Sequence, residues 1–311
     1  MKILISDKLQ VEGIKIFEDN DFEVVENFKI THEELKEEIG KYDGIVVRSR
    51  TILTADVLEN AKNLKVIGRA GVGLDNIDRE KAAQMDIEVL NTPEAPAVSV
   101  AELSLGLMLT LARKISHADR TTHQGQWNKN EYLGYTLQGK KLGLIGFGNI
   151  AKYLAKISIA LGMKVGVYSR FSKGQVAIDE AKKIGCSIYN SIEDLLKDAQ
   201  IVSLHLPATS QTENIINEER IKLMRKDAII INTARGSLID ENALVKALKN
   251  KDIAGAALDV YREEPVKNQE LIKCEENLVL TPHIASQSVE SQTVAATMIA
   301  EKMTNFLKKF E

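Results

Sequence analysis

The sequence predicts an α/β fold with two doubly wound parallel sheets, in which the first domain is discontinuous and is completed by the last helix. Short apolar strands alternate with helical segments through most of the 311 residues, as in parallel sheets covered by helices on both faces. A strand, a glycine-rich turn and a helix follow one another at residues 142–161. A final helix at 287–309 lies outside the rhythm of the preceding strands, so we expect it to return to the first domain.

The alternation divides into two series of strands. The first series is expected at 2–6, 22–25, 44–47, 64–68 and 87–90. A long apolar helix at 98–115 precedes the second series, which is expected at 142–145, 164–168, 187–189, 201–206, 228–232, 253–258 and 278–280. We therefore assign residues 1–93 and 287–311 to a flavodoxin-like domain and residues 94–286 to a Rossmann-like domain.

The composition argues against several classes of protein. A net charge of -3 does not attract nucleic acid or an anionic membrane. We therefore expect a small-molecule partner. Cys186 and Cys274 lie far apart without ligand-like spacing, which indicates neither a zinc site nor a disulfide framework, and we expect no metal. The longest apolar stretch, residues 103–112, is shorter than the ~20 residues of a membrane span. The N-terminus reads as a strand and not as a signal peptide, so we expect the protein in the cytoplasm.

A glycine pattern, G-x-G-x-x-A, lies at the first turn of the strand–turn–helix–strand unit at 142–170. Gly146 permits a tight turn, Gly148 lets the backbone approach a pyrophosphate, and Ala151 allows close packing of the helix on the strand. The positive end of the helix that follows faces the same pyrophosphate. The pattern predicts a dinucleotide site in the second domain, and a plain glycine turn is the alternative.

The residue that should hold the adenosine ribose departs from the usual acidic residue. Ser169 stands there, followed by Arg170 and, close behind, Lys173. A carboxylate would repel a ribose 2′-phosphate, whereas a hydroxyl and a guanidinium would bind it. These residues favour NADPH over NADH, unless Arg170 is only a solvated loop charge.

The first domain contains a candidate anion site. Arg48 and Arg50 follow the strand at 44–47, at the end of the sheet where open α/β folds bind ligands. The next strand is followed by Arg69, Ala70, Gly71, Val72 and Gly73, whose exposed backbone N–H groups suit a carboxylate. The alternative is a set of surface arginines beside a structural turn.

Three polar residues follow strands of the second domain: Arg235, Glu264 and His283. Reduction of a ketone by hydride needs a proton donor at the carbonyl oxygen, and histidine titrates near neutral pH. A carboxylate on its other ring nitrogen would orient the imidazole, and an arginine can bind the carboxylate of a 2-oxo acid through two hydrogen bonds. Together with a dinucleotide fold, the trio predicts a dehydrogenase.

Six segments spread over nearly the full chain resemble the D-isomer-specific 2-hydroxyacid dehydrogenase family, and most of all its phosphoglycerate dehydrogenase branch. They are 69-RAGVGLDNID-78, 91-NTPEAPAVSVAE-102, 142-LGLIGFGNIA-151, 231-INTARGSLIDENAL-244, 258-LDVYREEP-265 and 281-TPHIAS-286.

The resemblance implies a role for each matching residue. Arg235 would bind substrate, His283 would be the acid/base, Glu264 would tune it, and Asp259 would contact the nicotinamide amide. The loop Ala70 to Gly73 would hold the substrate carboxylate. The cofactor cleft would also be lined by Asn149, Ile150, Pro207, Thr212, Thr233, Ala234 and Ala285. The family further implies domains that close over substrate and a homodimer formed through the cofactor domain.

The substrate stays open between two candidates. The negative charge of a phosphate could be balanced by Arg48, Arg50 and Arg69. This favours the 3-phosphoglycerate/3-phosphohydroxypyruvate pair of serine biosynthesis. Ser169 and Arg170 instead resemble NADP-preferring glyoxylate and hydroxypyruvate reductases. The chain ends after its final helix, so we expect no serine feedback. A third alternative, a nucleotide-sensing corepressor, is disfavoured by the intact trio.

Overall fold

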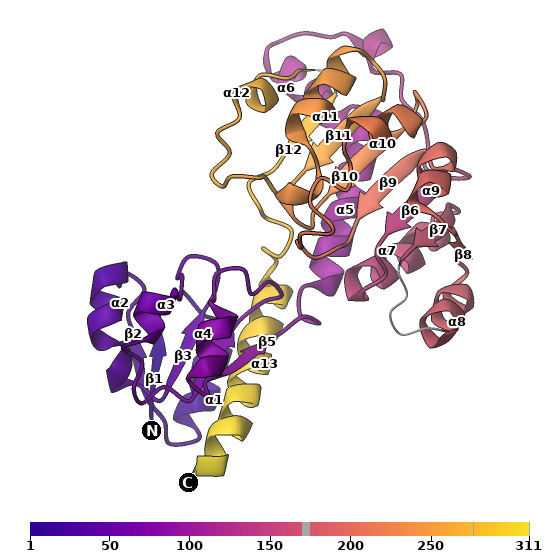
Figure 1. The fold of residues 1–311 in the computed structure, drawn as a ribbon. Helices are drawn as coiled ribbons and strands as arrows, with labels where there is room; N and C mark the ends of the chain where they lie inside the picture. The colour runs from indigo at the N-terminus through magenta and orange to yellow at the C-terminus, as the bar shows by residue number, and fades with distance from the viewer. Residues whose placement is uncertain (170–174, 276, 311) are drawn as a thin grey trace. The chain divides into compact units, whose positions relative to one another are not determined.

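A computed structural model describes residues 1–169, 175–275 and 277–310 of the chain (Figure 1). The chain forms two compact units, one made of Met1–Ala97 with Ser286–Glu311 and the other of Val98–Ala285. Each unit is built on its own parallel sheet, which confirms the predicted α/β class. Among the described residues, no helix is both long and apolar enough to cross a lipid bilayer.

Within residues 1–97 and 286–310, the sheet has five parallel strands in the order β2-β1-β3-β4-β5. The strands are β1 (Lys2–Ile5), β2 (Glu23–Glu26), β3 (Gly44–Val47), β4 (Val66–Arg69) and β5 (Glu88–Asn91). The helices are α1 (Val11–Glu18), α2 (His32–Glu38), α3 (Ala55–Leu58), α4 (Arg79–Gln84) and α13 (Val289–Leu307), with the 3-10 turns η1 (Ile39–Lys41) and η4 (Lys308–Phe310).

The last helix completes the core of this first unit, as the sequence predicts. Ala296, Ile299 and Met303 of α13 are fully buried with Ile3 of β1 and Phe17 of α1. Figure 1 shows α13, in yellow, running beside α1 and the indigo strands. The helix is two residues shorter at each end than the predicted 287–309.

In the described part of residues 98–285, the second sheet has seven parallel strands in the order β12-β11-β10-β9-β6-β7-β8. The strands are β6 (Lys141–Ile145), β7 (Lys164–Tyr168), β8 (Ser187–Ile188), β9 (Ile201–Leu204), β10 (Ile229–Asn232), β11 (Gly255–Leu258) and β12 (Leu278–Leu280). The helices are α5 (Ala97–Arg113), α6 (Ile115–His123), α7 (Asn149–Ala160), α8 (Gln175–Ile184), α9 (Ile192–Asp198), α10 (Glu218–Leu223), α11 (Glu241–Lys249) and α12 (Gln269–Ile272), with the 3-10 turns η2 (Lys129–Tyr132) and η3 (Gly236–Leu238).

The strand order of this second sheet determines where a ligand can bind. Successive strands run outward from β6 in both directions, with β7 on one side and β9 on the other. In open α/β sheets, ligands occupy the crevice at the carboxyl ends of the strands where the order reverses. The glycine turn after β6 lies at this point.

The long helix predicted at 98–115 is divided in the structure. Its first part, α5, ends at Arg113, because Lys114 takes a left-handed conformation with φ of 52°. A second helix, α6, then continues to His123. The apolar pattern of the sequence predicts neither the break nor α6.

Candidate active site

The glycine turn joins β6 to α7. Gly146 has φ of +97°, and a Cβ on it would lie 2.3 Å from the carbonyl oxygen of His205, so only glycine fits there. Gly148 caps α7, and a Cβ built on it would meet no atom within 4 Å among the described residues. Open space beside the N-terminus of a twelve-residue helix is what a pyrophosphate requires. The turn therefore fits a dinucleotide.

Most of the other predicted cofactor residues of this unit follow its strands closely or begin its helices. Asn149 and Ile150 begin α7, Ser169 follows β7, Pro207 and Thr212 come after β9, and Thr233 and Ala234 follow β10. Parallel strands direct their carboxyl ends to one edge of the sheet, so these residues share the edge that carries the glycine turn. Arg170 and Lys173 lie outside the described residues.

Arg235, Glu264 and His283 follow three neighbouring strands, β10, β11 and β12. His283 Nδ1 lies 2.7 Å from Glu264 Oε2, and the two side chains are 46% and 38% exposed. Nε2 of the imidazole makes no hydrogen bond with any described residue. The arrangement is a histidine oriented by a carboxylate, with its outer nitrogen accessible to a ligand.

The backbone around Arg235 is held by a buried amide. Asn232 is fully buried at the end of β10, and its Nδ2 donates to the carbonyl of Arg235 at 2.9 Å while its Oδ1 accepts from the N–H of Ala234 at 3.1 Å. Thr233, in the same turn, bonds Ser104 of α5 through their hydroxyls at 2.9 Å. The turn that carries Arg235 is thus fixed from both sides.

The loop that carries His283 is organised by Asp259. This carboxylate is fully buried and accepts hydrogen bonds from the Thr281 hydroxyl at 2.6 Å and from the N–H groups of Ile284 and Ala285, each at 2.8 Å. His283 itself has φ of 53°, which is uncommon for a residue with a side chain. Asp259 therefore stabilises an unusual backbone conformation at the candidate acid/base.

Further hydrogen bonds tie the same loop to the body of the unit. The Tyr261 hydroxyl donates to the carbonyl of Thr281 at 2.8 Å, and the Ser99 hydroxyl of α5 donates to the carbonyl of Ala285 at 2.7 Å. Burial raises the pKa of Tyr261 to about 12, so its hydroxyl remains a donor at neutral pH. The His283 loop is held at its start and at its end.

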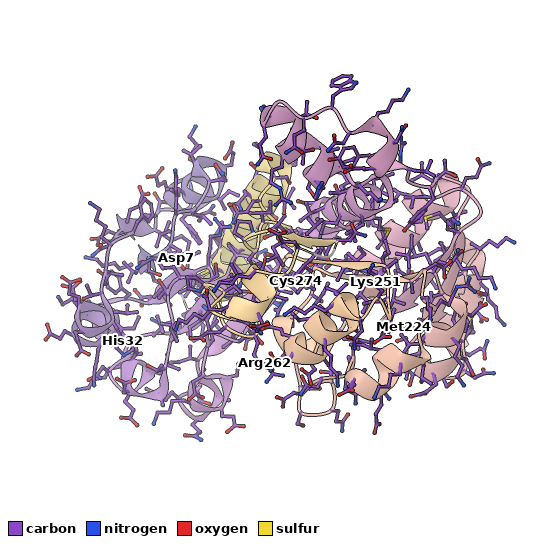
Figure 2. The ribbon with its side chains drawn as sticks, turned by 90° about the horizontal axis from the view of Figure 1, so that it is seen from above. Asp7, His32, Met224, Lys251, Arg262 and Cys274 are labelled. Carbon is purple, nitrogen blue, oxygen red and sulfur yellow. The ribbon has the colours of Figure 1, made fainter. Side chains whose placement is uncertain are left out.

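In the first unit, a buried carboxylate organises the loop after β3. Asp7 is 4% exposed and accepts from the N–H of Arg48 at 2.6 Å, the hydroxyl of Thr51 at 2.9 Å and Nε of Arg50 at 2.9 Å. The amide of Asn76 donates to the carbonyls of Arg48 and Thr51 at 2.8 and 2.6 Å. The conformation of residues 48–51 is thus defined by their neighbours, and Figure 2 labels Asp7 at this position.

The three arginines predicted to face a substrate differ in their surroundings. The guanidinium of Arg50 donates to Asp7 and to the carbonyls of Ser6 and Ile30, which gives it a structural role, and its substrate contact stays a prediction. Arg48 contacts the carbonyl of Lys8 at 3.4 Å, and burial lowers the pKa of its guanidinium.

Arg69 lies against the predicted carboxylate loop. A Cβ on Gly71 would lie 1.4 Å from Nη1 of Arg69, so glycine at 71 lets the guanidinium fold over the loop that runs from Ala70 through Val72 to Gly73. Nη1 also donates to the carbonyl of Ala70 at 3.4 Å. The N–H of Ala70 donates to the carbonyl of Val47 at 3.0 Å and Gly71 is buried, so the anion site stays a prediction that rests on the guanidinium and on residues 71–73.

The second unit of the chain matches a known protein family. Residues 105–285 match the family model described as "D-isomer specific 2-hydroxyacid dehydrogenase, NAD binding domain". The chain belongs to the D-isomer specific 2-hydroxyacid dehydrogenase family. The glycine turn after β6 thus lies in the family's NAD binding domain, and when NAD or NADP is bound the turn would face its pyrophosphate.

Relatives within the 2-hydroxyacid dehydrogenase family carry different names. D-3-phosphoglycerate dehydrogenase of Methanocaldococcus jannaschii is 44% identical over 99% of this chain, and the chain spans 58% of that relative's length. Glyoxylate reductase of Thermococcus litoralis is 40% identical over 99% of this chain and 94% of its own. Among solved structures, the TT0316 protein of Thermus thermophilus is 33% identical with a TM-score of 0.89, covering 99% of this chain and 97% of that one.

Sequence reasoning missed several residues around the candidate site. Asp7 and Asn232 adjoin strands in the same way as the candidate residues, but nothing in the sequence marks them as buried. His205 also follows a strand, β9, and its Nε2 lies 2.9 Å from the Ser203 hydroxyl. Burial lowers the pKa of His205 to about 4. Among the described residues, no group of three or more His, Cys, Asp or Glu side chains could hold a metal ion.

Proposed function

We propose that the protein interconverts a D-2-hydroxy acid and its 2-oxo acid with NAD or NADP. The observation that carries the proposal is the 2.7 Å contact between His283 Nδ1 and Glu264 Oε2, beside the strand end that carries Arg235. A histidine paired with a carboxylate is a general acid/base, and an arginine is suited to a substrate carboxylate. Membership of the family supports the same chemistry.

In this proposal each residue has one task during reduction. The nicotinamide, when bound, supplies the hydride that adds to the carbonyl carbon. Arg235 binds the carboxylate of the 2-oxo acid and polarises the adjacent carbonyl. His283 donates a proton to the carbonyl oxygen, so the products are the hydroxy acid and the oxidised cofactor. Glu264 orients the imidazole and stabilises its positive charge; in the oxidative direction His283 accepts the proton.

As the leading substrate we propose 3-phosphoglycerate with its product 3-phosphohydroxypyruvate. The support is the similarity to a D-3-phosphoglycerate dehydrogenase and the presence of Arg48 and Arg69 in the first unit. Arg48 is the stronger candidate for the phosphate, because Arg50 is bound to Asp7. We assign the loop Ala70 to Gly73 to the substrate carboxylate.

A second candidate is reduction of glyoxylate or hydroxypyruvate with NADPH. The similarity to a glyoxylate reductase over 94% of that relative's length supports it. Ser169 and Arg170 also favour it, because they would bind a ribose 2′-phosphate that an acidic residue would repel. The two candidates differ in the group that the substrate carries at the end away from its carboxylate. The hydride and proton transfer is the same in both.

The test is a comparison of kcat/KM for phosphohydroxypyruvate, hydroxypyruvate and glyoxylate, each with NADH and NADPH. Phosphohydroxypyruvate should be preferred by more than ~100-fold, equivalent to ~2.7 kcal/mol of transition-state discrimination. Arg48→Ala should raise KM for that substrate alone, while Arg79→Ala, an exposed arginine of α4, should change nothing. Preference for the unphosphorylated acids would establish the second candidate.

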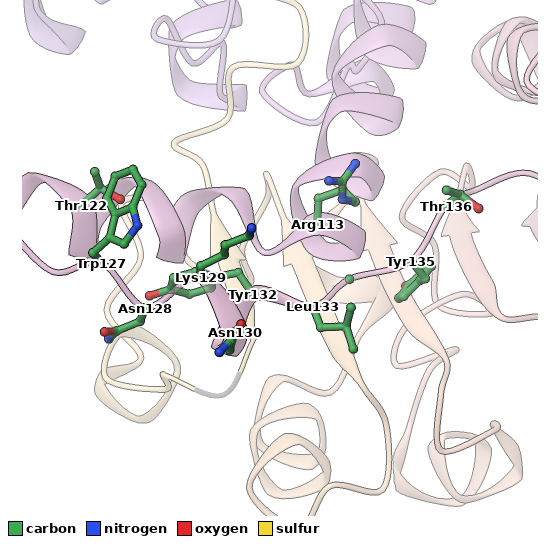
Figure 3. A pocket seen from close by; sticks show the side chains of 11 residues that line it. Arg113, Thr122, Trp127, Asn128, Lys129, Asn130, Tyr132, Leu133, Tyr135 and Thr136 are labelled. Carbon is green, nitrogen blue, oxygen red and sulfur yellow. The ribbon is translucent and has the colours of Figure 1, made fainter.

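We also propose that the protein is a homodimer formed through the second unit. Trp127 and Leu133 are each 85% exposed on the segment between α6 and β6. They line an open pocket of about 870 Å³ with Arg113, Tyr132 and Tyr135 (Figure 3), and none of the candidate active-site residues lines it. Large exposed apolar side chains rarely gather on a monomer surface, and a second copy of the chain would cover them.

A further inference from the structure

The loop that carries Glu264 is closed by a carboxylate from a neighbouring helix. Glu241, the first residue of α11, is 8% exposed. Its Oε1 accepts a hydrogen bond from the N–H of Arg262 at 2.8 Å, and its Oε2 accepts one from Nδ2 of Asn268 at 3.0 Å. Arg262 and Asn268 lie on either side of Glu264 in the sequence, so Glu241 joins the two ends of the segment in which Glu264 lies.

Glu264 depends on this segment for its geometry. Its Oε1 accepts from the N–H of Tyr261 at 3.1 Å, one residue before Arg262, and its Oε2 faces His283 at 2.7 Å. A shift of the backbone at 261–262 would therefore move the carboxylate relative to the imidazole. Figure 2 labels Arg262, whose guanidinium bonds Asn214 and Glu213 and leaves its N–H to Glu241.

The same segment packs on the turn that carries Arg235. A Cβ on Gly236 would lie 1.9 Å from the carbonyl carbon of Tyr261, so the two backbones are in direct contact. The first turn of α11 begins shortly after Gly236. Its first residue, Glu241, binds the N–H of Arg262, the residue after Tyr261. Glu241 thus holds the segment with Glu264 against the turn with Arg235.

The hydrogen bonds of the Glu241 carboxylate are directed to the segment that carries Glu264. A buried carboxylate costs free energy unless it is fully hydrogen bonded. Within the described residues Glu241 has no cationic partner, and both of its oxygens are used by neutral donors of one loop. The positive end of α11 stabilises its charge.

We propose that Glu241 is a positioning residue for the Glu264–His283 pair, acting through the backbone of residues 261–268. This inference rests on the proposed acid/base role of His283. It does not depend on which 2-oxo acid is the substrate, because the proton transfer is common to all of them.

The test compares Glu241→Ala, Glu241→Gln and Asp240→Ala. Glu241→Ala should lower kcat by about tenfold to a hundredfold, since small misplacements of catalytic groups have effects of this size, while the Kd for NADH or NADPH stays unchanged. Glu241→Gln can still accept from the N–H of Arg262 and should recover most of kcat. Asp240→Ala removes the cap of α11, which accepts from Asn242 and Ala243, and should lower Tm without lowering kcat.

A second readout does not need turnover. The ring nitrogen chemical shifts of His283 report its hydrogen bond to Glu264, and Glu241→Ala should move them, whereas Asp240→Ala should not. Equal losses of kcat in Glu241→Ala and Asp240→Ala, or wild-type kcat and ring shifts in folded Glu241→Ala, would overturn the proposal. If the wild-type protein reduces no 2-oxo acid, the proposed function fails, and the ring shifts alone decide whether Glu241 positions the pair.

Discussion

At the scale of single residues, buried carboxylates hold the loops that carry the candidate chemistry. Asp259 fixes the His283 loop, and Asp7 fixes the loop of Arg48 and Arg50, each by accepting hydrogen bonds from backbone N–H groups and hydroxyls. A charge in such a position is stable only while all of its donors are in place. Each loop is thereby restricted to one conformation, which is what a preorganised site needs.

Asp259 also has a predicted contact with the nicotinamide amide, and that contact stays a proposal. Its two oxygens already accept hydrogen bonds from Thr281, Ile284 and Ala285. Carboxylate oxygens have further lone pairs, but Asp259 is fully buried, so an amide donor could reach it only if the residues that cover it move. In that case a single residue would link the position of the cofactor ring to the position of His283.

His205 predicts a dependence of stability on pH. Burial lowers its pKa to about 4 in the folded protein, whereas in the unfolded chain it lies near 6.5. Between these values the unfolded chain binds more protons, so the free energy of unfolding should decrease as the pH falls from 6.5 toward 4. Urea unfolding at several pH values measures this, and His205→Gln should flatten the slope. An equal slope in the variant would show that other groups cause it.

The sequence could locate the candidate residues but not the residues that support them. Arg235, Glu264 and His283 follow strands that are visible as apolar runs, so their common edge could be predicted. Asp7 and Glu241 look like ordinary surface acids in the sequence, because burial depends on how distant loops pack. The hydrogen bond from the Arg50 guanidinium to Asp7 could not be predicted for the same reason.

At the scale of elements, the predictable features were those with a strong local pattern. The turn from β6 to α7 could be predicted because its glycines meet a geometric requirement. The break at Lys114 could not, because lysine seldom adopts a left-handed conformation and the apolar pattern runs through it. The path of the backbone from α5 to α6 is therefore set by tertiary packing and not by local preference.

The glycine turn predicts two different effects of an added methyl group. Gly148→Ala should leave Tm unchanged, because its Cβ meets nothing within 4 Å of the described residues. The same methyl should weaken binding of NADH or NADPH by more than about tenfold, or 1.4 kcal/mol, because it occupies the space of the pyrophosphate. Gly146→Ala should instead destabilise the fold by about 1–3 kcal/mol, owing to its φ of +97° and the nearby His205 carbonyl.

Titration of each variant with NADH and NADPH, followed by fluorescence, together with a thermal melt, separates these effects. Unchanged cofactor affinity in Gly148→Ala would mean that the dinucleotide does not approach this turn. A stable Gly146→Ala would contradict the close contact with His205.

At the scale of the whole molecule, the alternation of strands and helices was sufficient to predict two parallel sheets and the return of the last helix. The apolar positions of α13 gave it a face to bury, and the first unit had an uncovered face of its sheet to receive it. The substrate could not be predicted at this scale, because relatives that match 99% of this chain have different names and act, by those names, on different acids.

The proposed dimer predicts a change of mass. Leu133→Asp places a charge on the exposed apolar segment near Trp127, and it should convert a dimer to a monomer without lowering Tm, because Leu133 is 85% exposed. Light scattering after gel filtration measures the mass, with Leu161→Asp, at a half-exposed position after α7, as the control. A wild-type monomer, or a dimeric Leu133→Asp variant, would contradict the assignment of this surface.

The central claim is that His283 moves the proton during hydride transfer, and His283→Gln tests it most directly. With the preferred 2-oxo acid, kcat should fall by about 10³-fold, within the range for loss of a general acid. The Kd for NADH or NADPH should stay within twofold of wild type, because the imidazole is not part of the glycine turn. A folded His283→Gln protein that retains wild-type kcat would contradict the account.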